Sequence, residues 1–141
     1  MKFLLDTNVL SEIRKPEHRA DPSVRAWVAG RRASEFGLCV ISVLEIELGI
    51  ARLERKDTSQ AGVLRKWLDE ELLDAFAGRI LDVDIKAARI AGRMHVPDPR
   101  PERDALLAAV ARAHGLVVVT RNVSDFRHLG VTVLNPWEEN T

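Results

Sequence analysis

The residues with the clearest capacity for chemistry in this sequence are acids that stand where buried strands are predicted to end. Asp6 directly follows the apolar run 3–5, and Glu45 lies in the first turn of the helix predicted after the run 38–41. Ligands of an open parallel sheet bind beyond the carboxyl ends of its strands, so acids placed there come close together. Asp104 stands at the start of a later helix and joins them if that helix directs its first turn to the same edge.

Two further polar residues, Asn122 and Asp125, follow the valine-rich run 116–119 and are expected at the same edge. Several carboxylates at one place repel one another unless a cation offsets their charge. Magnesium suits such a set because it prefers oxygen ligands, binds through one or two carboxylates and completes its shell with water and phosphate oxygens. Such an ion polarises a phosphodiester and acidifies a water molecule. The acids together predict hydrolysis of a phosphodiester.

Each acid also has a purely structural interpretation. Ser42 and Glu45 have the spacing of a capping box, in which the glutamate accepts a hydrogen bond from a free backbone N–H at the helix start. Asp104 in an opening helical turn suits the helix dipole. The polar residues after the first and fourth predicted strands favour turns. Only the convergence of these residues at one sheet edge favours a metal site over separate structural roles.

Motifs for other common reactions are missing from the sequence. No two glycines are separated by a single residue, which excludes the dinucleotide fingerprint, and there is no P-loop. The histidines at 18, 95, 114 and 128 lack metal-ligand spacing, and the single cysteine, Cys39, is interpreted as a buried strand residue. An aspartyl phosphate on Asp6 is an alternative, but the second aspartate usual for that mechanism is replaced by Asn8.

Short apolar strands alternate with amphipathic helices along the chain, which indicates an α/β fold with a parallel sheet between helical layers. A chain of 141 residues has the size of one domain, expected to span 1–141. The proline-rich run 97–101 is predicted to be an exposed loop. We expect strands at 3–5, 38–41, 80–83, 116–119 and 131–134, and helices at 9–13, 24–30, 43–53, 59–78, 85–94 and 102–114.

The overall charge gives no indication of a polyanionic partner, because 21 basic and 21 acidic residues cancel. Any site for nucleic acid must therefore be local. No apolar stretch has the length of a signal-peptide core or of a membrane helix. We therefore expect a cytoplasmic protein with no membrane association.

Three motifs, taken in order, resemble those of the PIN-domain family. They are Leu4-Leu5-Asp6-Thr7-Asn8-Val9-Leu10, Ile41-Ser42-Val43-Leu44-Glu45-Ile46-Glu47-Leu48-Gly49, and the segment from Asp104 to Thr120-Arg121-Asn122-Val123-Ser124-Asp125-Phe126. The resemblance runs nearly end to end and is closest to the VapC-like toxins, including the FitB-like branch, which 76–80 and 135–137 also match. It implies a single-domain PIN-like fold, an α/β/α sandwich around a parallel sheet of about five strands.

The resemblance also implies a function. That function is a magnesium- or manganese-dependent endoribonuclease, the toxin of a VapBC-type toxin–antitoxin pair, which cleaves structured RNA such as transfer RNA. Asp6 and Asp104 match the direct metal ligands, and Glu45 either binds the metal or holds a metal-bound water. The polar positions that orient the site are matched by Thr7, Asn8 and Thr120. The family further implies a homodimer and a VapB-like antitoxin, through which alone the pair binds operator DNA.

The sequence departs from one common family pattern at the fourth acidic position. Many members have aspartate where this chain has Asn122, and Asp125 is the alternative source of that charge, so one metal or two is left open. The neutral Asn122 also supports an alternative function, a catalytically weak PIN-like module that acts by binding protein or RNA. An acidic site must recruit a polyanion with positive charge beside it. RNA phosphate contacts are therefore predicted at Arg14, Lys15, Arg25 and Arg121.

Overall fold

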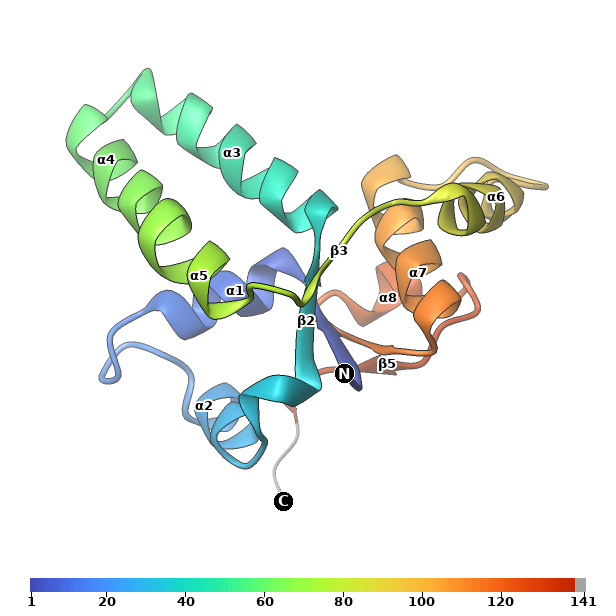
Figure 1. Ribbon diagram of the computed structural model, residues 1–141, viewed down its shortest axis with the longest axis horizontal. Helices are drawn as coiled ribbons and strands as arrows, with labels where there is room; N and C mark the ends of the chain where they lie inside the picture. The colour runs from blue at the N-terminus through green and yellow to red at the C-terminus, as the bar shows by residue number, and fades with distance from the viewer. Residues whose placement is uncertain (139–141) are drawn as a thin grey trace.

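A five-stranded parallel sheet forms the centre of the protein in the computed structural model, which describes residues 1–138. The strand order is β3-β2-β1-β4-β5, so β1 is central and pairs with β2 on one side and β4 on the other (Figure 1). The strands are β1 (Phe3–Leu5), β2 (Phe36–Cys39), β3 (Ile80–Leu81), β4 (Val117–Val119) and β5 (Val133–Leu134). The predicted α/β class and parallel sheet are confirmed.

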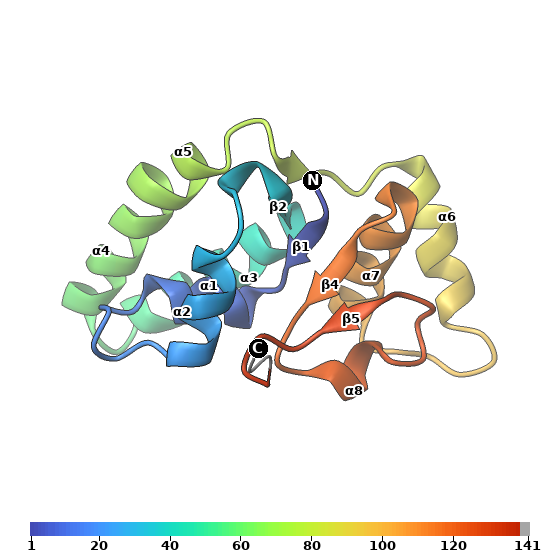
Figure 2. The same cartoon turned by 90° about the horizontal axis from the view of Figure 1, so that it is seen from below.

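Helices cover both faces of the sheet. Figures 1 and 2 show α6 and α7 on the side opposite to the α3–α4–α5 arm. The helical segments are α1 (Thr7–Arg14), α2 (Pro22–Ala29), η1 (Ala33–Glu35), α3 (Val40–Glu54), α4 (Thr58–Lys66), η2 (Trp67–Leu72), α5 (Leu73–Ala75), α6 (Ile85–Met94), α7 (Glu102–His114) and α8 (Val123–Phe126). The sheet therefore lies between two helical layers.

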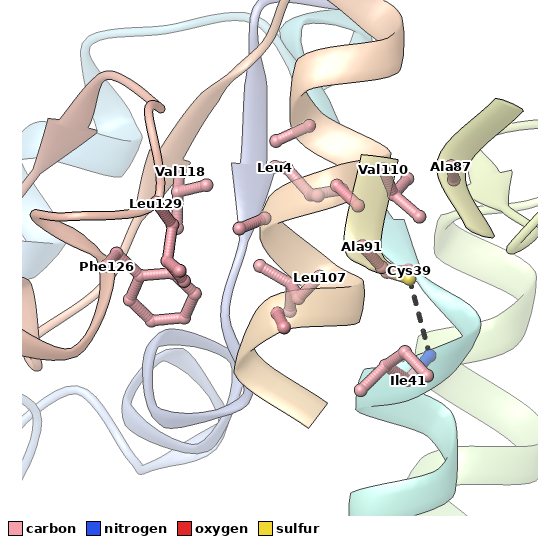
Figure 3. Close-up of a cluster of buried hydrophobic side chains, with 14 of the residues drawn as sticks. Leu4, Cys39, Ile41, Ala87, Ala91, Leu107, Val110, Val118, Phe126 and Leu129 are labelled. Atoms are coloured by element: carbon pink, nitrogen blue, oxygen red, sulfur yellow. Dashed lines mark hydrogen bonds between the residues drawn. The ribbon is translucent and has the colours of Figure 1, made fainter. Parts of the chain in front are cut away.

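Neighbouring residues of each strand serve two different cores, because side chains alternate across a sheet. Leu4 and Val118 are buried in the core beneath α6 and α7, where Figure 3 shows them near Leu107. Leu5 and Val119 are buried in the second core, with residues of α1, α2 and α3. Burial on both faces explains why these strands are apolar throughout.

Helix α7 begins and ends where the sequence predicts, at Glu102 and His114. Pro101 precedes it, and Gly115 ends it with a φ of 66°, the left-handed conformation that favours glycine after a helix. Its middle is buried under the sheet, so the first turn that carries Asp104 is held in a fixed place.

The predicted boundary between the second strand and its helix is wrong. The strand ends at Cys39 rather than residue 41, and α3 starts at once at Val40, with the Cys39 sulfur accepting the Ile41 N–H at 3.4 Å. Ser42 is therefore not the cap; it lies inside the helix, and its buried hydroxyl has no hydrogen-bond partner within residues 1–138. Hydrophobicity could not locate this boundary because residues 38–41 are apolar across it.

The helix predicted over 59–78 contains an irregular middle. Its backbone is α-helical in α4, becomes π-helical over Trp67–Leu72 and returns to α-helix in α5. Periodicity did not predict this change, because an apolar pattern does not distinguish the two windings over six residues. No helix within residues 1–138 combines the length and the apolar character that a membrane crossing requires.

Candidate active site

Asp6 is the buried centre of the predicted site. It leaves the central strand β1 and acts as the N-cap of α1, so its Oδ1 accepts the Thr7 N–H at 2.8 Å. Its Oδ2 accepts the Thr120 hydroxyl at 2.8 Å and an amide N–H of Asn8 at 3.3 Å. Burial raises the pKa of Asp6, and the negative charges of Glu45 and Asp125 add to the rise, while the hydrogen bonds from Thr120 and Thr7 oppose it.

Thr120 holds this carboxylate from the end of β4. Its hydroxyl is fully buried; it donates to Asp6 and accepts from the Asn8 side chain at 3.2 Å and the Asn122 N–H at 3.1 Å. The side-chain Oδ1 of Asn8 in turn accepts the Arg121 N–H at 3.2 Å. The ends of β1 and β4 are thereby joined, and the three predicted orienting residues, Thr7, Asn8 and Thr120, all contact Asp6.

Glu45 is joined to Asp6 through Thr7. The Thr7 hydroxyl donates to Oε1 of Glu45 at 2.6 Å, while its N–H donates to Asp6. Glu45 lies in the second turn of α3 and its carboxylate accepts a side-chain hydroxyl, so the predicted capping box with Ser42 does not form. The structural interpretation of Glu45 is therefore wrong, and its side chain faces the predicted site instead.

Asp104 lies near the other acids, because α7 directs its first turn to the same edge of the sheet. Burial raises the pKa of Asp104 to about 6, the charges of Asp6, Asp125 and Glu45 add to the rise, and the positive charge of Arg103 opposes it. The charges of the three other acids all act on Asp104, so the four acids share one neighbourhood. Their convergence, which the sequence could predict only conditionally, is present in the structure.

At the fourth position, Asp125 and Asn122 differ in their electrostatic effect. Asp125 lies in α8 and raises the pKa of both Asp6 and Asp104. Asn122 is exposed and precedes α8; its N–H donates to Thr120 and its carbonyl accepts the Asp125 N–H at 3.1 Å. Charge at this corner of the site comes from Asp125.

The donor chemistry of this acidic set fits a hard divalent cation. The side chains offer carboxylate oxygens and no nitrogen or sulfur. The raised pKa values of Asp6 and Asp104 mean that ionisation of these two carboxyl groups is disfavoured unless a positive charge compensates it. Within residues 1–138, however, no three His, Cys, Asp or Glu side chains are close enough to enclose an ion by themselves. A cation bound here would therefore need water or substrate oxygens to complete its coordination shell.

A family model described as PIN domain matches residues 3–131. The chain belongs to the PIN-domain family. This PIN domain is 34% identical to VapC ribonuclease Y4jK of Sinorhizobium fredii, over 96% of this chain and 98% of that relative. It is 36% identical to toxin FitB of Neisseria gonorrhoeae, over 97% of this chain and 99% of the relative. A solved structure of FitAB bound to an IR36 DNA fragment contains a chain with a TM-score of 0.84 and 33% identity, over 96% of each chain.

Two basic residues predicted to contact RNA are paired with acids in this PIN domain. Lys15 Nζ lies 2.9 Å from Oε1 of Glu12, and Arg25 Nη2 lies 2.8 Å from Oε1 of Glu17. Burial would raise the pKa of Glu12, but hydrogen bonds from Lys15 and the Asp21 N–H lower it below its ordinary value. Both cations therefore have partners inside the protein, and their contact with RNA stays a prediction.

The other two predicted RNA contacts lie against tryptophan rings. The guanidinium carbon of Arg14 is 5.6 Å from the ring centroid of Trp67, and that of Arg121 is 5.1 Å from the ring of Trp137. The Arg121 backbone is also fixed by Asn8, one step from Asp6. Of these two, Arg121 is the one linked to Asp6, through the side chain of Asn8.

Sequence reasoning missed Arg103, which contacts the acidic set directly. Its Nε is 3.4 Å from Oε2 of Glu45, and its positive charge opposes the rise in the pKa of its neighbour Asp104. The sequence signal that could have identified Arg103 is its position immediately before Asp104, a predicted metal ligand.

Proposed function

We propose that this chain is a divalent-metal-dependent endoribonuclease that acts as the toxin of a VapBC-type toxin–antitoxin pair. The observation that carries the proposal is that acids from four separate segments meet: Thr7 hydrogen-bonds both Asp6 and Glu45, and the charges of Asp6, Glu45 and Asp125 act on Asp104. Support for ribonuclease and toxin activity comes from the names of the relatives at 34% and 36% identity.

In this proposal Asp6 and Asp104 bind Mg²⁺ or Mn²⁺ directly, with Glu45 and Asp125 as the further acids of the site. When bound, such an ion supplies polarisation of a phosphodiester and an acidified water molecule. Glu45 is held toward the site by the Thr7 hydroxyl. The neutral Asn122 contributes no charge to the site; its backbone N–H donates a hydrogen bond to the Thr120 hydroxyl.

The protein's own hydrogen bonds orient the acids before any ligand arrives. The Asp6 carboxylate accepts three donors, which fixes its rotamer and directs its remaining lone pairs. Fixed ligand geometry of this kind raises metal affinity, and loss of one supporting partner typically costs about 10- to 100-fold. Thr7, Asn8 and Thr120 are positioning residues in this sense.

The proposed partners follow from the relatives. We infer that structured RNA such as transfer RNA is the substrate and that a small VapB-like antitoxin neutralises the toxin. We further infer that operator DNA is bound through the antitoxin, because a similar chain occurs in FitAB bound to DNA. A homodimer and a cytoplasmic location complete the proposal; light scattering of the purified chain tests the first of these.

Cleavage of labelled transfer RNA by the purified full chain tests the proposed activity. We expect cleavage with Mg²⁺ or Mn²⁺, none in EDTA, and a loss of about 100-fold or more in Asp6→Asn and Asp104→Asn. Asp74→Asn is a matched control, because Asp74 is exposed on α5. Cleavage by both site variants at the wild-type rate would overturn the proposal.

A second candidate function is a catalytically weak module that binds protein or RNA. The neutral Asn122 and the lack of a preformed three-acid cluster within the described chain favour it. Induced expression in bacteria separates the two candidates. A nuclease toxin arrests growth only with Asp6 intact, whereas a binding module arrests growth equally well with Asp6→Asn.

A further inference from the structure

Arg103 places a positive charge at the edge of the acidic site. It lies in the first turn of α7, directly before Asp104, and its Nε is 3.4 Å from Oε2 of Glu45. The other oxygen of Glu45 accepts the Thr7 hydroxyl. The Arg103 side chain is nevertheless 48% exposed. A cation is thus paired with one of the proposed site acids while about half of its side-chain surface remains exposed to solvent.

Local stability does not explain this placement. A cation in the first turn of a helix is opposed by the helix dipole. An exposed ion pair stabilises a protein only slightly, because water and salt screen it. Replacement of Arg103 is therefore expected to leave the fold intact, which makes the residue suitable for a functional test.

The basic side chain of Arg65 is held more firmly than that of Arg103. Arg65 donates to both oxygens of Glu47, at 2.6 and 2.9 Å, which is the bidentate geometry that fixes a guanidinium. Arg103 approaches Glu45 through Nε. A guanidinium has five N–H donors in a planar fork that matches a phosphate group, so the Nη side of Arg103 is suited to a second, anionic partner.

We propose that Arg103 is a phosphate-binding residue of the site. In the metal-free protein it is docked on Glu45, and when a divalent ion binds among the acids it transfers to the RNA backbone. The ion and Arg103 are both attracted by the same carboxylates, so they compete there, while the incoming phosphate offers Arg103 a new partner. The inference rests on the proposed ribonuclease function and deepens it.

This arrangement predicts two effects of opposite sign when the charge of Arg103 is removed. Without the competing cation, Arg103→Gln should bind Mn²⁺ about threefold more tightly in the absence of RNA. With Mn²⁺ saturating, the same variant should show a KM for transfer RNA raised about fivefold and a weaker salt dependence of kcat/KM, with kcat within about twofold of wild type. A merely structural role would weaken both affinities together.

Calorimetric Mn²⁺ titration and cleavage kinetics on labelled transfer RNA test the proposal. Arg103→Lys should recover part of the KM, because it keeps the charge but loses the fork. Arg112→Gln, near the other end of α7, is the matched control and should change neither quantity. Unchanged KM in Arg103→Gln, or weaker Mn²⁺ binding, would overturn the role of Arg103. A wild-type chain that neither binds Mn²⁺ nor cuts RNA would overturn the proposed function itself.

Discussion

The two halves of the acidic site are held in different ways. Asp6 and Glu45, which come from the β1 and β2 side, are tied together by hydrogen bonds through Thr7, and Asp6 is further fixed by Thr120. Asp104 and Asp125, which come from α7 and α8, form no side-chain hydrogen bond within residues 1–138, and they are placed by their helices alone. One half is oriented in advance by the protein's own hydrogen bonds, and in the proposed function a cation joins the other half to it.

This difference assigns separate roles to the two halves. The hydrogen-bonded half resists movement, because each buried polar group has a partner and loss of one leaves another unsatisfied. In the second half, burial raises the pKa of Asp104 and the charges of Asp6, Asp125 and Glu45 add to the rise, so the ionised form of Asp104 is disfavoured in the absence of a cation. Substitutions in the first half should therefore lower stability, whereas neutralisation in the second half should raise it.

Thr120→Val is expected to have the largest effect on the fold. It removes the buried hydroxyl that donates to Asp6 and accepts from Asn8 and Asn122, at nearly constant volume. We expect a loss of about 2 kcal/mol in the free energy of unfolding, together with weaker metal binding. Urea denaturation measures the first, with Thr120→Ser as a control that keeps the hydroxyl. A valine variant as stable as the wild type would contradict the claim that these hydrogen bonds hold the Asp6 half of the site rigid.

Thr7→Val should have a smaller effect, confined to Glu45. The Thr7 N–H still donates to Asp6, but the hydroxyl that holds Glu45 is lost. Because Glu45 is only half-buried, we expect the free energy of unfolding to fall by about 1 kcal/mol or less. We expect the cleavage rate to fall about 10-fold. RNA cleavage assays on Thr7→Val and Thr7→Ser check this, and equal rates in the two variants would contradict the role of the hydroxyl.

Asp104→Asn should stabilise the metal-free protein. The ordinary pKa of an aspartate is 3.8, and the folded-state pKa of Asp104 is about 6, so folding favours the protonated form. Its contribution to stability is thus lost as pH rises from about 4 to about 6, and the penalty is complete above that range. After solvent screening we expect a gain of about 1 kcal/mol at pH 7 in the asparagine variant.

Thermal unfolding in EDTA at pH 7 and at pH 4 checks this sign. The difference between Asp104→Asn and the wild type should shrink toward acid, because the wild-type carboxyl is then protonated in the folded state. An asparagine variant that is less stable than the wild type at pH 7 would contradict the claim that the charge of Asp104 destabilises the metal-free protein.

Asn122→Asp should have the smallest effect. It supplies the aspartate that many family members have at this position, but the side chain is exposed and charge is already present at Asp125. We expect metal affinity within about twofold of the wild type, because an exposed charge is largely screened. Calorimetric titration measures it, and a tenfold gain would indicate that Asn122 occupies a ligand position.

The sequence predicted most of the fold because local signals and packing agree. Pro101 and Gly115 bound α7, and the apolar run 3–5 is followed by Asp6, which caps the next helix. The end of β2 was missed because Cys39 acts as the cap where serine was expected. The π-helical turn was missed because its apolar spacing resembles that of an α-helix.

The identity of the acids of the site could be predicted from the sequence, but the contacts that hold them together could not. Strand ends pointed to Asp6 and Glu45 and, conditionally on the direction of its helix, to Asp104, and the resemblance to the PIN-domain family matched all three. The link from Thr7 to Glu45 joins positions 38 residues apart, which no local pattern records. Arg103 was missed for a related reason, since its contact depends on how α7 meets α3.

Calorimetric titration of Mn²⁺ into the metal-free full chain tests the central claim most directly. If one ion joins the two halves, the wild type should bind with measurable heat, and Asp6→Asn and Asp104→Asn, one from each half, should each lower the affinity by about 10-fold or more. Asp74→Asn should titrate as the wild type does. Wild-type affinity in either half's variant, or no binding by the wild type, would contradict a metal site shared between the two halves.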